Sequence, residues 1–197
     1  MGELGPLIMQ IAMGIGLAAC AGLRLFLPLF VVSVAGLTEW LPLDERFAWM
    51  GTWPAVTVFG IAVVVELLAD KIPWVDNALS ATQGWLKPVA GAMLAVAMLS
   101  ELTPLQATVL GVIAGGSTAG VVHLLQTTTR LISSTLTGGL ANPVLSVGED
   151  VLALTGSVLA LVVPLALLLM ISLSAIAVWI GLRRFRTRTA GDPPAGV

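Results

Sequence analysis

The chain has 197 residues, of which 57% are hydrophobic and only 10% are charged, and its formal net charge is −2. Soluble proteins usually carry about 25% charged residues, and a chain this apolar cannot cover a water-facing surface at this size. The mean hydropathy of +1.01 therefore predicts an integral membrane protein surrounded by the lipid bilayer. No basic patch outside the C-terminal tail points to nucleic acid, and a single cysteine excludes an intramolecular disulfide.

Six apolar segments follow one another along the chain. They cover approximately residues 6–36, 53–70, 86–100, 104–129 and 143–163, and a sixth ends at residue 182. An α-helix needs about 20 residues to cross about 30 Å of hydrocarbon. The first and fourth segments are longer than that, so we expect each to tilt, break or continue into the interface. The third segment is short for a span of its own.

Basic residues predict the orientation of these segments. Four arginines close the chain at positions 183, 184, 186 and 188, which places the C-terminus in the cytoplasm. Six spans then place the N-terminus there too. Lys71, Lys87 and Arg130 fall on the cytoplasmic side, and Glu39, Asp44, Glu45 and Glu101 fall outside. We expect a multi-pass protein of the inner membrane with both termini in the cytoplasm.

Two runs of five small residues, 18–22 and 116–120, each open a set of three predicted spans. Because three is odd, the two sets would have opposite orientations, as in many secondary transporters. The predicted fold is all-α, with two inverted three-helix repeats at residues 1–101 and 102–184 and a flexible cytoplasmic tail at 185–197. Alternatively, small residues such as Gly22, Gly116 and Gly120 only let helices pack closely, within the chain or in a homodimer.

Carboxylates at the end of the second apolar segment are the first candidate site. Glu66 and Asp70 are four residues apart and share a helix face. Glu66 lies about 8 Å inside the cytoplasmic boundary, and a charge in hydrocarbon costs at least a few kcal/mol, so it should face protein or water. Asp70 could equally be an interfacial acid paired with Lys71 or Lys87. Asp76 is interpreted as a helix cap.

A second pair of acids follows a predicted helix start. Asn142 would cap this helix and Pro143 would open its first turn. Glu149 and Asp150 then lie about 9–10 Å from its cytoplasmic end, and intramembrane acids are functional-site candidates by default. His123 lies at a similar depth, so we expect acids and imidazole to form a proton or cation site. His123 could instead bond a backbone carbonyl.

Arg24 is the corresponding charge in the first segment, and residue counting places it toward the outer half. If it is buried, it needs an acidic partner or an anionic ligand. If the segment breaks at Gly22, a half-helix end lies nearby, as in broken-helix transporters. The alternative is that Arg24 extends to the outer interface.

Several short stretches together resemble a known family. They are residues 21–24, 66–77, 138–143 and the pair 149–150. In combination they resemble the uncharacterised bacterial membrane family called domain of unknown function 4126, over nearly the whole chain up to about residue 182. The resemblance implies a multi-pass membrane protein and no settled activity. The stretch 66–71 is also faintly similar to the Glu-x-Gly-Asp-Lys/Arg motifs of inverted-repeat cation exchangers, although its acids are four apart and the glycine is missing.

These features favour a small membrane transporter or channel for a cation or a proton-coupled solute. Glu66, Asp70, Glu149 and Asp150 would bind the ion, and Arg24 and His123 would border its pathway. No enzyme motif is present, and one cysteine and one histidine leave little for catalysis, so we expect neither an enzyme nor a cofactor. One alternative is a protein that translocates a lipid or polyprenyl phosphate held by Arg24. Another is a scaffold or assembly subunit whose ion pairs only fix helix register.

Overall fold

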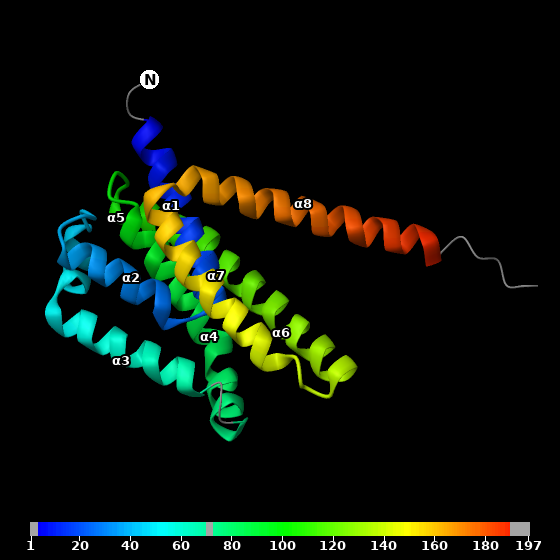
Figure 1. Cartoon of the computed structure of the whole chain (residues 1–197). Helices are drawn as coiled ribbons and strands as arrows, with labels where there is room; N and C mark the ends of the chain where they lie inside the picture. The colour runs from blue at the N-terminus through cyan, green and yellow to red at the C-terminus, as the bar shows by residue number, and fades with distance from the viewer. Residues whose placement is uncertain (1–3, 70–72, 190–197) are drawn as a thin grey trace, which may run out of the picture.

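The computed structural model describes residues 4–69 and 73–189, which form helices and their connections and contain no strand (Figure 1). The α-helices are α1 (Leu4–Leu23), α2 (Phe26–Leu37), α3 (Trp53–Ala69), α4 (Pro73–Met98), α5 (Pro104–Leu110), α6 (Ser117–Thr137), α7 (Asn142–Val162) and α8 (Pro164–Thr189). A 3₁₀-helix, η1 (Glu45–Gly51), precedes α3, and a π-helix, η2 (Gly111–Gly116), joins α5 to α6. The predicted all-helical class is therefore confirmed.

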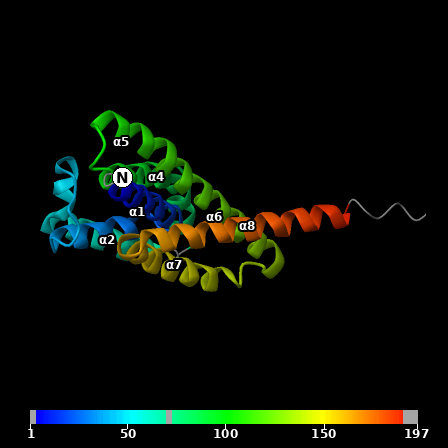
Figure 2. The same cartoon turned by 90° about the horizontal axis from the view of Figure 1, so that it is seen from above.

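Helix α1 lies at the centre of a bundle and packs against α4, α6 and α7. Figure 1 shows α2 and α3 as a pair on one side of this bundle, and both views show α8 leaving it after its first turns (Figure 2). The core lies where α1, α2 and α4 meet, around the fully buried Leu17, Val32 and Leu94. Many large apolar side chains face outward instead, as expected of a protein surrounded by lipid.

Small residues set the spacing of the bundle. A Cβ added to Gly14 of α1 would lie 3.1 Å from the Cα atom of Ala95 in α4. One added to Gly22 would lie 2.6 Å from the carbonyl oxygen of Ala119 in α6. At Gly116 and Gly120 the nearest atoms would be 3.4 and 3.7 Å away, which is ordinary contact. Gly22 therefore lies at a much closer helix crossing than the other two glycines.

The first apolar segment breaks between α1 and α2, and Pro28 explains the position. A proline within a helix has no N–H to donate and clashes with the carbonyl four residues earlier, which here belongs to Arg24. Helix α1 accordingly ends at Leu23, and α2 begins at Phe26, so that Pro28 lies in its first turn. The fourth segment is not broken, because α5, η2 and α6 continue over the 34 residues Pro104–Thr137.

Two predicted helix caps are wrong. Helix α4 begins at Pro73, before residue 86, where the third apolar segment was expected to begin, and it passes through Pro88, so this helix is longer than its apolar part. Asn142 is the first residue of α7 and not its cap, a position that Ala141 takes without a side-chain bond. The Nδ2 atom of Asn142 instead donates to Ser134 Oγ at 2.9 Å. Asp76 is the fourth residue of α4 and therefore not its N-cap, contrary to the prediction.

In the described part of the chain, three helices are long and apolar enough to cross a membrane, or four if the pair η1 and α3, bent by 64°, counts as one span. This supports a membrane protein but does not confirm six spans in two inverted halves. Gln10 Nε2 at the start of α1 donates to Ser100 Oγ at 2.9 Å, and the N–H of Glu101 donates to Gln10 Oε1 at 3.2 Å. The start of α1 and Glu101 therefore share one end of the molecule, so they cannot lie on opposite sides of the membrane as expected.

The seam between α4 and η2 gives a test of this packing. In a Gly115→Ala variant, the added Cβ would lie 2.5 Å from both Gly91 O and Ala95 Cβ, so the two helices must separate. We expect a loss of about 1–3 kcal/mol in unfolding free energy, measured by unfolding in detergent. The control is Gly148→Ala in α7, where nothing lies within 4 Å and a gain of about 0.5–1 kcal/mol is expected. Equal stability of the two variants would contradict the seam.

Candidate functional site

The break between α1 and α2 exposes backbone groups that a continuous helix would pair internally. At the start of α2, the N–H groups of Leu25 and Phe26 donate to Glu66 Oε1 and Oε2, at 2.8 and 3.1 Å. Gln83 Nε2 of α4 also donates to Glu66 Oε1, at 3.3 Å. Glu66 is 2% exposed, so this carboxylate of α3 lies between three elements. An anion at a helix N-terminus is also favoured by the helix dipole.

The other side of the break is the C-terminus of α1. The carbonyl oxygen of Leu23 accepts from Lys87 Nζ of α4 at 2.9 Å and from Gln126 Nε2 of α6 at 3.1 Å. Lys87 Nζ also donates to Gln126 Oε1 at 2.7 Å, and Gln126 Nε2 donates to Glu149 Oε2 at 2.7 Å. Lys87 is 1% exposed. The buried ammonium group of Lys87 therefore lies at the C-terminal end of α1, where the helix dipole favours a positive charge.

Arginines join this arrangement to α7. Arg24 Nε lies 2.5 Å from Asp150 Oδ1, and Arg24 Nη2 donates to Ser146 Oγ at 2.8 Å and lies 3.9 Å from Glu149 Oε2. Arg130 of α6 donates to both oxygens of Glu149, with its shorter bond at 2.5 Å. Glu149 thus receives hydrogen bonds from Arg130 and Gln126 on the same neighbouring helix.

We call this set of side chains the break network. It consists of Arg24, Glu66, Gln83, Lys87, Gln126, Arg130, Ser146, Glu149 and Asp150. Its charged members are three cations and three carboxylates, so their formal charges sum to zero. Unpaired charges would be very costly at this burial, and the balance removes most of that cost. The network links five elements, α3, α4, α6, α7 and the α1–α2 break, through side chains that reach one another across the bundle.

The structure brings together four of the predicted site residues, namely Arg24, Glu66, Glu149 and Asp150. Arg24 is 2% exposed and paired, which corrects its predicted place in the half opposite to the acids. The prediction failed because it counted α1 and α2 as one span, whereas the chain turns at Arg24. His123 lies beside α4, with Nε2 3.9 Å from where a Gly84 Cβ would be. Asp70 lies outside the described residues.

Sequence reasoning missed several members of the network. Gln83, Gln126 and Ser146 carry no charge. Lys87 and Arg130 were interpreted as markers of the cytoplasmic side, and Lys87 also as a possible partner of Asp70. A signal was present in their spacing, because polar residues recur four apart in otherwise apolar segments. The pairs are Glu66–Asp70, Gln83–Lys87, Gln126–Arg130 and Ser146–Asp150. Such a pair shares one helix face, so each predicts a polar stripe that must be buried against another.

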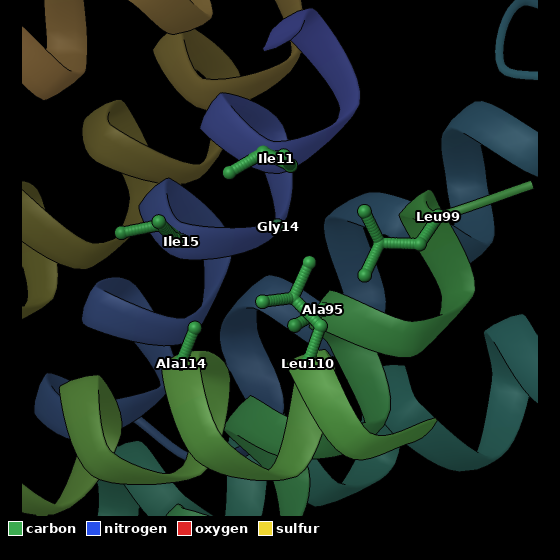
Figure 3. Close-up of a pocket in the computed structure, with 7 residues that line it drawn as sticks. All are labelled: Ile11, Gly14, Ile15, Ala95, Leu99, Leu110 and Ala114. Carbon is green, nitrogen blue, oxygen red and sulfur yellow. The ribbon is translucent and has the colours of Figure 1, made fainter. Parts of the chain in front are cut away.

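Two cavities between described residues are not lined by the break network. One, of about 10 Å³, lies between α1, α4 and α5, and its lining is apolar (Figure 3). A cavity this small and apolar does not hold a water molecule. The other, of about 330 Å³, lies between the end of α2 and η1, beside Glu39, which has a φ of 57°. Within the described ranges, no group of three or more His, Cys, Asp or Glu side chains could hold a metal ion.

The chain belongs to the family described as domain of unknown function 4126, which matches residues 11–184. This confirms the resemblance found in the sequence. The matched range contains every member of the break network. Neither the curated proteins nor the solved structures contain a match.

The pair between Arg24 and Asp150 can be tested by a double-mutant cycle. Arg24→Met leaves the buried carboxylates of α7 with one cation fewer, so we expect a loss of about 3–5 kcal/mol in unfolding free energy. Adding Asp150→Leu removes the unbalanced charge and should recover more than half of that loss. Unfolding in detergent measures these two variants and the single variant Asp150→Leu, which completes the cycle.

The control for this cycle is Arg46→Met, which removes the exposed partner of Asp44 at 2.7 Å and should change stability little. Hydrogen bonds from Arg46 hold the pKa of the Asp44 carboxyl below its ordinary value, but both groups lie outside the bundle. If Arg24→Met were as mild as Arg46→Met, the break network would not stabilise the fold.

Proposed function

We propose that this protein is a small ion-coupled membrane transporter in which the break network responds to a proton or a monovalent cation. The observation that carries the proposal is the broken first segment, whose two free ends are held by Lys87 and Glu66. Secondary transporters commonly place the ends of broken helices at their ion and substrate sites. Ionisable residues inside apolar helices are also costly, which favours a functional reason for them.

The charge balance of the network supports coupling to a proton or cation. Glu66 belongs to α3, Lys87 to α4, Arg130 to α6 and Glu149 to α7, so a relative movement of these helices separates at least one charged group from its partner. A carboxylate that loses its cation in a low-dielectric interior takes up a proton or another cation. Opening the network is thereby tied to binding an ion.

Burial of the network favours a transporter over a permanently open channel. Lys87, Glu66 and Arg24 are each at most 2% exposed, and neither cavity reaches them, so this arrangement is a closed one. Arg24 has Asp150 and Ser146 as partners, so a lipid phosphate would have to displace them. The arginines at 183–188 favour a cytoplasmic C-terminus in the inner membrane.

Transport can be tested in vesicles that contain the purified protein and a trapped pH-sensitive dye. A sodium or potassium gradient is imposed, and the internal pH is followed. We expect the protein to carry protons against one of these cations. Glu66→Gln and Glu149→Gln should each slow the pH change at least about tenfold, since loss of one charge-assisted interaction typically costs about 1.5–3 kcal/mol.

The matched control is Glu101→Gln, which makes the same chemical change at an exposed acid outside the network and should leave the rate unchanged. Wild-type rates in both network variants would remove these acids from the mechanism. If the wild-type protein carries no protons under either gradient but moves a labelled phospholipid between leaflets, the lipid alternative is favoured. If it does neither, the network only fixes helix register.

A further inference from the structure

We infer that the position held by Lys87 Nζ is a binding site for a monovalent cation of ammonium size, which Lys87 fills while that cation is absent. The inference rests on the proposed ion coupling and names the chemical class of the ion. Three features of the position carry it, namely its oxygen atoms, its local charge and its enclosure. We call this position the Lys87 seat.

Two oxygen atoms define the seat. The Leu23 carbonyl oxygen is 2.9 Å from Lys87 Nζ, and Gln126 Oε1 is 2.7 Å from it. These are ordinary distances for N–H···O bonds from an ammonium group. The Leu23 oxygen belongs to the free C-terminus of α1, where the helix dipole attracts a positive charge.

The orientation of the Gln126 amide keeps its oxygen directed toward the seat. Lysine can only donate hydrogen bonds and an ionised carboxylate can only accept them. Gln126 must therefore present Oε1 to Lys87 and Nε2 to Glu149, as observed at 2.7 Å in both bonds. The amide cannot reverse without losing both partners. The oxygen thus stays available to any cation that replaces the lysine.

The charges of the groups around the seat favour a cation with a single positive charge. The charged groups around the seat are Glu66 on α3, Arg24 at the break, Arg130 on α6 and Glu149 on α7, and His123 lies nearby on α6. Asp150 on α7 joins this set through its ion pair with Arg24. Counting His123 as neutral, these groups sum to −1 without Lys87 and to zero with it. A monovalent cation in the empty seat restores neutrality, whereas a divalent cation would leave an excess of +1.

The enclosure of the seat limits the size of the cation that it can hold and favours a cation that can donate hydrogen bonds. Lys87 is 1% exposed and Gln126 is 8% exposed, so a cation in the seat is stripped of its water. A bare ammonium ion can replace that water by donating to the two oxygens at the distances that Lys87 uses. A tetraalkylammonium ion has the same charge but has no N–H group and is much larger, so the seat should exclude it.

Lys87→Met is the variant that empties the seat with the least disturbance. The methionine side chain has the same number of chain atoms as lysine up to the Cε position, with a sulfur in place of Cδ, and ends there, so only the place of Nζ is left vacant. The purified variant in detergent is titrated with ammonium chloride at fixed pH, and its melting temperature is recorded. Tetramethylammonium chloride at the same concentrations controls for ionic strength.

We expect ammonium to raise the melting temperature of Lys87→Met saturably, by about 3–6 °C at tenfold its dissociation constant. Tetramethylammonium should not do so. The wild-type protein should respond to ammonium more weakly than Lys87→Met, because ammonium must first displace Lys87 from the seat. The double variant Lys87→Met/Glu66→Gln has two arginines against two acids, so it needs no cation and should not respond to ammonium.

An equal response of Lys87→Met to both salts, or no response to either, would overturn the inference. If Lys87→Met does not fold alone, ammonium present during purification should yield a monodisperse protein. Failure to fold in both salts, together with folding of the double variant, would also overturn it. Binding is measured here without transport, so an ammonium response together with failed vesicle assays would leave the seat standing and reject only the transport function.

Discussion

The backbone groups freed at the break between α1 and α2 constrain the rest of this structure. In a protein surrounded by hydrocarbon, no water is at hand to bond them, and each unsatisfied group costs several kcal/mol. Leu23 O therefore needs a donor, and the N–H groups of Leu25 and Phe26 need an acceptor. Lys87 and Glu66 meet these needs, with the charge sign that each helix end favours. Pro28 favours the break at this position, and the break leaves backbone groups that buried charges can bond.

Once Lys87 and Glu66 are buried, side chains from the surrounding helices must balance their charges, and these helices must pack closely enough for the side chains to meet. Gly14 and Gly22 let α4 and α6 approach α1 more closely than residues with a Cβ would allow, so that side chains of both helices reach the same carbonyl oxygen. Arg24, exposed to the bundle interior by the break, takes its partners from α7. The close packing of the helices and the polar contacts of the network therefore depend on each other, because the side chains reach their partners at this distance between helices.

The sequence was informative where lipid solvation alone decides the outcome, as in the apolar segments that became α1, α3 and α7. It failed where tertiary packing decides. The first residues of α4 are polar, and composition gave no reason to extend that helix back to Pro73. Arg24 was misplaced because a turn within an apolar segment changes the direction of the chain without changing its hydropathy. Gln126 was overlooked because an amide carries no charge. Its side chain nevertheless forms hydrogen bonds with Leu23, Lys87 and Glu149.

The position of Gln126 also bears on whether the network only holds the fold together. A direct ion pair between Lys87 and Glu149 in a low-dielectric interior would resist separation strongly. The structure instead places the neutral amide of Gln126 between these two charges, with one hydrogen bond to each of them. Ion pairs that serve stability alone are often replaceable by apolar side chains without loss. Hydrogen bonds to a neutral amide at the end of α1 are easier to exchange than a direct ion pair, which is what the proposed transport would require of the network.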